Sequence, residues 1–388
     1  MMKKTLIALA AIAATSAFAQ SQVRLSGVLD AGVYSLSKAD GNKDTQAMID
    51  SSLQSSRWQL DGSEDLGGGM KAIFLAQGDI QTNNGGSNQN GMFRRGAYVG
   101  LQGGFGELTL GLRGNVLIAA NASVVPVAGN SVTTNLSGAI GSARGGYSDF
   151  YTRNAVTYIS PVLLGGLTLS GQYGMANNVN SSSDGSVTAW SAVYTTGGLR
   201  LIASSQNRME NGVASSSNTN ANSTQAATSC LIVATPCPAA SQYLSPNAPT
   251  SYAKQTSLAG ARYKFGKFEL GGAAISNKVA KDVGGSMIEY TGTIVGGAWD
   301  LTPAIRLGLN FANSEGSYFT NAQAHYMLSK RSTVYVNAGW ANNGTDGRSN
   351  FAAYASNTGN SPAVQVTGAA ATADRTQSAV GVGIIHSF

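Results

Sequence analysis

The sequence has few charged residues, few cysteines and no long apolar run. Only 11% of its 388 residues are charged, and it contains two cysteines and two histidines. No segment approaches the ~20 apolar residues that a spanning helix requires, so a helical membrane protein is excluded. The scarcity of cysteine and histidine also leaves little material for a metal centre.

Glycine is abundant instead, with 49 residues against 8 prolines. Short segments in which apolar and polar residues alternate recur along the chain, and a period of two is typical of β-strands. Polar turns separate these segments, and no linker divides the chain into halves. We therefore predict one all-β domain, above the usual size of a soluble domain but of the size of a large barrel.

The first 19 residues have the pattern of a secretory signal peptide. Lys3 and Lys4 precede an apolar run from Leu6 to Ala14, and the small-residue site Ala17-Phe18-Ala19 follows. The run is too short to anchor the chain across a membrane. We predict that cleavage leaves residues 20–388 as the mature domain, with the net charge lowered from +6 to +4.

Both ends of the mature chain alternate between apolar and polar side chains. The first segment sets Val23, Leu25, Leu29 and Val33 against Arg24, Ser26, Asp30 and Tyr34, and the last sets Val380, Val382, Ile384, His386 and Phe388 on one face. An open apolar strand at a terminus would template aggregation. A closed barrel removes this edge, and apolar-out, polar-in alternation is the pattern of a transmembrane barrel wall.

Turns of two lengths join these segments. Short turns are expected at 103–106, 161–166, 195–198 and 266–267, with a tight polar turn at 62–69, whereas long polar segments cover 115–149 and 206–255. Short turns on one rim and long loops on the other are typical of outer-membrane barrels. About sixteen segments of ~9 to 11 residues can be counted. Met287 to Leu301 fits either phase, so its faces are left unassigned.

Six short motifs occur in order along nearly the whole mature chain. They are Leu25 to Gly32, Ser56-Arg57-Trp58 with Gly62 to Gly67, Ala97 to Leu101, Arg153 to Pro161, Tyr326 to Ser332, and His386-Ser387-Phe388. Together they make the chain resemble the general porins of Gram-negative outer membranes, particularly the β-proteobacterial branch.

The resemblance implies a sixteen-stranded antiparallel transmembrane β-barrel that assembles as a homotrimer in the outer membrane. Its third external loop, residues 115–149 here, is expected to fold into the lumen and form the constriction. The resemblance further implies contact with lipid and lipopolysaccharide, and insertion by the barrel-assembly machinery with Phe388 as part of the signal. The solutes expected to pass through the channel are small and anionic or neutral. No cofactor and no nucleic-acid partner are expected.

Arginines of the barrel wall face the constriction loop in this family. Arg57 and Arg153 occupy matching positions in the motifs, and Arg113 is displaced by one residue from the position of a third. A shift of one residue turns a side chain to the other face unless a bulge absorbs it, although the alternation still places Arg113 inward. Arg144 and Asp149 are further candidates, in or beside the loop. The alternative for each arginine is a structural role in the wall.

The assigned phases give the lumen a positive charge. Nine basic residues oppose the apolar faces, against four acidic ones: Arg24, Arg57, Lys71, Arg113, Arg153, Arg200, Arg262, Lys264 and Arg306, against Asp30, Asp61, Glu107 and Glu269. On the lipid face each basic residue would cost ~2 to 4 kcal/mol at the midplane. In a wet bore they concentrate anions. We therefore expect passive diffusion of small hydrophilic solutes, with anions favoured.

Three other functions remain open. The first is a channel selective for small anions such as organic acids or phosphate. The second is an adhesin that presents residues 206–255, although the composition of this segment is that of any solvated loop. The third is a barrel hydrolase, for which His325 would be the base because His386 shares the outward face near the membrane boundary. No neighbouring sequence marks a nucleophile, so we predict that the chain is not an enzyme.

Cys230 and Cys237 lie in a segment rich in serine, threonine, asparagine and alanine. Outside the cytoplasm, a disulfide that closes a small loop is favoured. A metal site is not expected there, because neither histidine lies near these cysteines in the sequence.

Overall fold

The computed structural model describes residues 22–40, 43–87, 91–121, 124–126, 150–177, 185–211, 251–280, 287–314, 317–342 and 376–388. The predicted signal peptide and most of the predicted constriction loop, with Arg144 and Asp149, lie outside these residues. Cys230 and Cys237 lie outside them too, so their disulfide stays a prediction.

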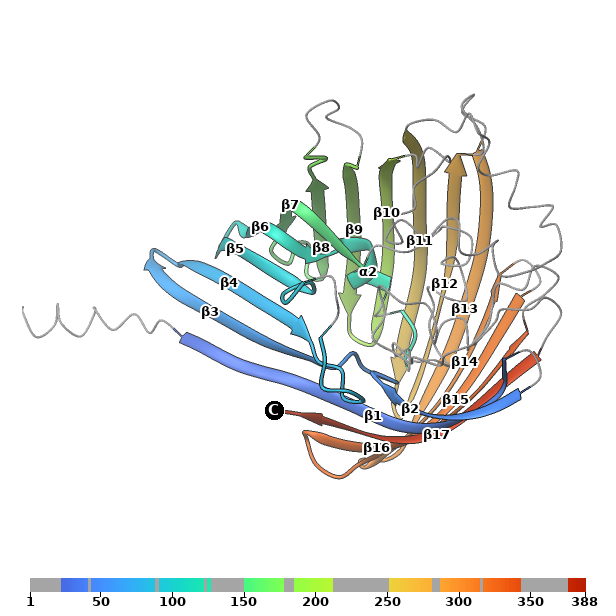
Figure 1. Ribbon diagram of the computed structural model, residues 1–388. Coiled ribbons are helices and arrows are strands. Elements are labelled where there is room, and N and C mark those ends of the chain that lie inside the picture. The colour runs from blue at the N-terminus through green and yellow to red at the C-terminus, as the bar shows by residue number, and fades with distance from the viewer. Residues whose placement is uncertain are drawn as a thin grey trace, which may run out of the picture.

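Nearly every described element is a strand. In chain order they are β1 (Gln22–Asp40), β2 (Lys43–Asp50), β3 (Arg57–Gly67), β4 (Met70–Asp79), β5 (Gly96–Gly103), β6 (Gly106–Gly114), α2 (Val116–Asn121), β7 (Tyr151–Ile159), β8 (Leu167–Gly174), β9 (Val187–Thr196), β10 (Leu199–Asn211), β11 (Ser251–Phe265), β12 (Phe268–Ala280), β13 (Met287–Thr302), β14 (Ile305–Ser314), β15 (Ser317–Met327), β16 (Ser332–Asn342) and β17 (Thr376–Ser387). Consecutive strands pair antiparallel and curve round an interior (Figure 1). In the described part of the chain, no helix has the length and apolar character needed to cross a membrane.

β1 closes the sheet from both sides. β17 pairs with it from Val28 opposite Ser387 to Leu36 opposite Ala379, so the two ends of the chain meet. On the other edge, β2 pairs with the second half of β1 and β3 with the first half. β2 and β3 are therefore one wall strand interrupted at 51–56. The predicted closed, sixteen-stranded antiparallel barrel is confirmed.

A buried carboxylate holds this interruption in place. Asp30 accepts hydrogen bonds from the backbone N–H groups of Leu53 and Gln54, both at 2.6 Å, and from the Tyr335 hydroxyl at 2.7 Å. Asp30 was expected as an open lumen charge, but its exposed fraction is 0%. It is a structural acceptor inside the wall because the interrupted strand presents unpaired N–H groups that require a partner.

The alternation of faces follows the sequence. Val23, Leu25 and Val33 are 65%, 64% and 59% exposed on the outside of the wall, whereas Tyr34 on the opposite face is buried. β13 is now assigned as well. Val295 and Trp299 are exposed on the outer face, and Asp300, the next residue after Trp299, lies on the inner face and forms an ion pair with Arg306.

Two segments, one predicted as a turn and one as a long loop, are strand in part. β3 continues to Gly67, so the turn expected at 62–69 is confined to its last residues; Ser63 pairs with both β1 and β4. The polar segment 206–255 likewise begins and ends as strand, because β10 and β11 pair from Gln206 opposite Thr256 to Asn211 opposite Ser251. Backbone pairing across the sheet outweighs the low strand preference of these polar residues.

Two described pieces of the predicted constriction loop, residues 116–121 and 124–126, lie against the inner wall. α2 contacts β9, β10 and β11 and is seen inside the barrel beside them (Figure 1). Its Leu117, with Val124 and Val125 beyond it, joins a buried apolar cluster with wall residues that include Ile202 and Leu258. This packing explains the apolar residues in a loop, since burial removes them from the water of the lumen. The course of 127–149 lies outside the described residues.

The C-terminal residue completes the seam of the barrel. Phe388 exchanges two backbone hydrogen bonds of 3.1 Å with Gly27. Its ring lies over Gly27 so closely that a Cβ atom there would overlap the ring. The seam therefore depends on the aromatic side chain of Phe388 and on the lack of any side chain at Gly27.

We expect deletion of Phe388 to lower the amount of folded trimer in the outer membrane several-fold, because the first strand then loses its terminal partner. The measurement is the amount of heat-modifiable trimer in outer-membrane fractions. Phe388→Tyr, which keeps the ring and the backbone, should assemble normally. Unchanged assembly of the deletion would show that the seam closes without this residue.

Candidate functional site

The lumen side of β3 and β4 carries a cluster of three arginines around one carboxylate. Arg57, the first residue of β3, stands opposite Asp79, the last residue of β4. Asp79 is buried and forms ion pairs with Arg94 and with Arg95, the latter at 2.9 Å. The positive charges of Arg57 and Arg95 act on each other. We call this group, with Tyr151, the β3–β4 cluster.

Arg57 is the least compensated member of the cluster. Its Nη1 donates to the backbone oxygen of Ser55 at 2.9 Å, and it forms no ion pair with a carboxylate of the described residues. Arg95 lies 5.5 Å from the centroid of the Tyr151 ring, which completes the wall of the cluster on the β7 side. Three guanidinium groups with a single carboxylate leave this part of the lumen positive.

Arg113 faces the same lumen from β6. It forms an ion pair with Glu107, donates to the Thr109 hydroxyl at 2.9 Å, and lies 4.9 Å from the centroid of the Tyr98 ring. The inward direction expected from the alternation is therefore observed. Its charge, however, is balanced by Glu107, an acid that the same alternation had also placed inward.

A bulge lies on the partner strand of Arg113. Gly111 stands opposite Ala155, but Arg113 stands opposite Thr152, so three steps along β7 match two along β6. Within the bulge, Thr152 is buried and donates to Gln172, whereas the neighbouring Arg153 is exposed. Alternation counted from either end of β7 gives Arg153 opposite directions. Arg153 is thus more exposed than Arg57, Arg94 and Arg95, the arginines of the β3–β4 cluster.

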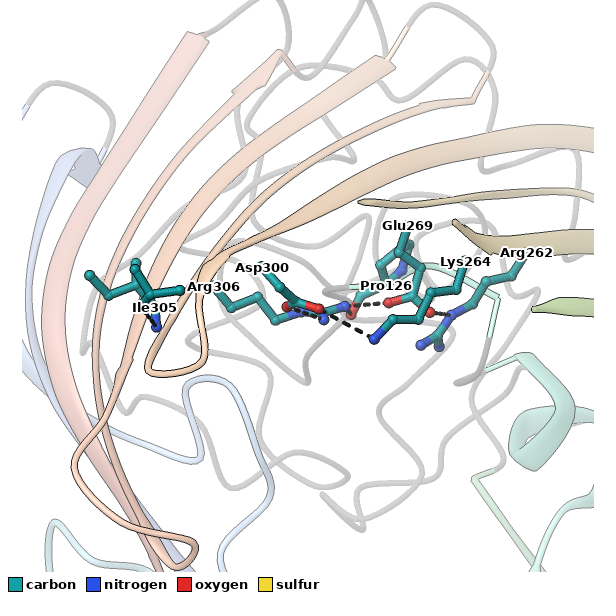
Figure 2. A network of polar contacts seen from close by, with 8 residues as sticks. Pro126, Arg262, Lys264, Glu269, Asp300, Ile305 and Arg306 are labelled. Atoms are coloured by element: carbon teal, nitrogen blue, oxygen red, sulfur yellow. Dashed lines mark hydrogen bonds and ion pairs between the residues drawn. The ribbon is translucent and has the colours of Figure 1, made fainter. Parts of the chain in front are cut away.

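A second charged group lies on strands β11 to β14, and we call it the β11–β14 cluster (Figure 2). Glu269 forms ion pairs with Arg262 and Arg306, and Asp300 forms ion pairs with Arg306 at 2.7 Å and Lys264 at 3.3 Å. The three cations thus share two carboxylates. Asp300 was missed because the phase of its segment could not be assigned from the sequence.

The β11–β14 cluster also contacts residues 124–126 of the predicted constriction loop. Nη2 of Arg306 donates to the backbone oxygen of Pro126 at 3.3 Å (Figure 2). Close by, Val124 is fully buried against the glycines of β11 and β12. We call Gly260, Gly271 and Arg306 the loop seat.

Arg94, Arg95, Asp79 and Tyr151 were missed from the sequence. Each lies at the end of a strand or in the segment before one, where period-two alternation gives no direction. The pair Arg94-Arg95 directly before β5 was the available signal.

The histidines have ordinary surroundings. His325 shares a contact of 2.9 Å with the Gln323 side chain, and His386, exposed as expected, shares one of 2.9 Å with the Ser332 hydroxyl across β16 and β17. Within the described ranges, no three histidine, cysteine or acidic side chains gather as metal ligands would. Neither histidine is joined to a serine and an acid together in that part of the chain.

The sequence model of the family described as Gram-negative porin matches residues 5–346. This match spans most of the chain. The chain belongs to the Gram-negative porin family. The predicted outer-membrane location follows, and we refer to the chain as the porin below.

Relatives and solved structures agree with this membership. The porin is 44% identical over 112 residues to outer membrane porin protein 32 of Delftia acidovorans, covering 28% of this chain and 31% of that protein. It is 31% identical over 223 residues to an outer membrane porin protein of Bordetella pertussis, covering 52% and 56%. The matched stretches therefore span less than two thirds of either relative. The fold is similar to that of an anion-selective porin from Comamonas acidovorans, with a TM-score of 0.72, 22% identity, and coverage of 95% and 100%.

Proposed function

We propose that the porin forms a water-filled channel for passive diffusion of small hydrophilic solutes and ions, with anions favoured. The observation that carries this proposal is the β3–β4 cluster, in which Arg94 and Arg95 share the carboxylate of Asp79 and Arg57 has no ion pair within the described residues. Fixed cations on the wall of a narrow aqueous pore raise the local concentration of anions.

We also propose that Arg57, Arg113 and Arg153 line the constriction and that the loop 115–149 narrows it. The contacts of α2 and of residues 124–126 with the inner wall support the inward course of the loop. Assembly as a homotrimer, contact with lipopolysaccharide and insertion by the barrel-assembly machinery accord with family membership. Such a channel uses no catalytic group or cofactor.

The test is the reversal potential and single-channel conductance of the refolded porin in a planar bilayer under a salt gradient. We expect stepwise conductance and a reversal potential of the sign given by an anion-selective pore. Cation selectivity would leave a channel but overturn the proposed charge of its lumen. A folded barrel without conductance would overturn the channel itself.

A channel selective for small anions such as organic acids or phosphate remains the second candidate, because guanidinium groups bind carboxylate and phosphate oxygens in pairs. Concentration-dependent block of the current by one such solute would favour it over general diffusion.

A further inference from the structure

Arg200 is an inward-facing cation in a different part of the barrel from the β3–β4 cluster. It lies on β10 opposite Arg262 of β11 and Thr195 of β9. Two residues further along the same face, Ile202 packs into the apolar cluster inside the barrel. Arg262 forms an ion pair with Glu269 on the inner wall (Figure 2). Arg200 therefore faces the lumen next to the β11–β14 cluster.

The two neighbouring arginines differ in their partners. Arg262 shares Glu269 with Arg306, whereas Arg200 forms no ion pair with a carboxylate of the described residues. The Nε atom of Arg200 is buried and has no hydrogen-bond partner there. An arginine that keeps a donor unsatisfied beside a second arginine favours a negatively charged ligand, which would satisfy the donor and relieve the repulsion.

The height of Arg200 in the barrel sets it apart from Arg57. Arg200 comes two residues after the Gly197–Gly198 turn, and so lies ~7 Å along its strand from the rim of short turns. Arg57 is at the far end of β3, ~33 Å along that strand from its own turn at the same rim. An anion that passes Arg57 from the side of the long loops must still pass the level of Arg200.

We propose that Arg200, with Arg262 and the Thr195 hydroxyl beside it, forms a second anion-binding step near the short-turn rim. Its ligands are small oxyanions, carboxylates or phosphate, because a planar guanidinium donates to two oxygens at once whereas chloride accepts at a single centre. This inference adds a binding site to the proposed anion-favouring channel, and it rests on that proposed function.

The test compares Arg200→Gln with Lys264→Gln. Both substitutions remove one positive charge near the same rim, since the backbone N–H of Lys264 donates to the backbone oxygen of Gly198 at 2.9 Å. Lys264 differs in that it forms an ion pair with Asp300. Reversal potentials are measured in gradients of potassium chloride, acetate and phosphate, with folding checked by the heat-modifiability of the trimer.

We expect Arg200→Gln to lower the permeability of acetate and phosphate relative to potassium about threefold, and that of chloride less. Lys264→Gln should change the permeability of all three anions little and by the same factor. Arg200→Lys should restore the permeability of chloride but not the full permeability of acetate and phosphate. If Arg200→Gln lowers the permeability of only one of the two oxyanions, acetate or phosphate, that oxyanion is the ligand of Arg200.

The proposed second site would be overturned if Arg200→Gln and Lys264→Gln lowered anion permeability equally, or if Arg200→Gln lowered the permeability of chloride and of the oxyanions equally. Either result would mean that Arg200 acts only through its charge. These outcomes presuppose an anion-selective parent channel. A parent channel without anion selectivity would instead mean that the proposed function fails, so the two failures are distinguishable.

Discussion

Replacing Arg57 with glutamine is expected to lower the anion preference of the channel more than any other single arginine substitution in the predicted constriction. Arg57 is half-buried, lies beside Arg95, and has no carboxylate partner in the described part of the barrel. One unit charge at 4 Å changes the energy of an ion by about 1 kcal/mol in water, which corresponds to about fivefold in local concentration. We expect a change of this order in the chloride-to-potassium permeability ratio.

Arg113 and Arg153 supply the comparison. Neutralising Arg113 leaves Glu107 without its partner, so the lumen loses a cation and gains a free carboxylate nearby. Arg113→Gln should therefore lower anion preference as well, and Glu107→Gln should raise it. Arg153 lies exposed in the bulge of β7, and we expect Arg153→Gln to have the smallest effect of the three.

Reversal potentials of the four variants in one salt gradient measure this order. Arg57→Lys, which keeps the charge, is the matched control and should retain most of the selectivity. An Arg153→Gln effect as large as that of Arg57→Gln would show that the bulge residue reaches the constriction and that the assigned order is wrong.

Substitution of Gly271 is expected to change the conductance itself. A Cβ atom at this position would come closer to the Val124 carbonyl oxygen than real Cβ atoms do, and one at Gly260 would press against the Val124 side chain. Because the wall is fixed by backbone pairing on both edges of β12, the loop must yield. Gly271→Ala should therefore push residues 124–126 toward the axis of the pore.

A displacement of ~1 Å toward the axis is enough to accommodate a methyl group, and in a narrow waist it should lower the single-channel conductance by about a quarter. Arg306→Met acts on the same loop differently. It removes the donor to Pro126 without adding bulk at the seat, and Glu269 retains its ion pair with Arg262. We expect larger current fluctuations in the open channel, because the loop is held less firmly.

Gly171→Ala is the matched control for Gly271→Ala. Gly171 lies in β8, and a Cβ atom there would have no heavy atom within 4 Å. Single-channel recordings of the folded variants give conductance and open-channel noise together. If Gly271→Ala conducts as the parent does, the loop seat does not set the width of the pore.

Alternation along the chain determined the wall of this barrel. Val23, Leu25 and Val33 face outward and Arg113 faces inward as a period of two requires, because each side chain's face depends only on its neighbours in the same strand. The closing pair of β1 and β17 was also predictable, since an apolar terminal strand needs a partner. Where alternation breaks, at the bulge beside Arg153 and in the ambiguous phase of β13, sequence patterns could not assign a face.

The distribution of free charge in the lumen was decided by the tertiary structure. The sequence predicted nine inward cations and four inward acids, but it could not pair them. Register across strands brings Glu269 and Asp300 to Arg306, and a segment before β5 brings Arg94 and Arg95 to Asp79. These contacts join residues on different strands and loops, so local periodicity carries no information about them. Which inward arginines lack a carboxylate partner among the described residues, as Arg57 and Arg200 do, follows from that pairing and from no local pattern.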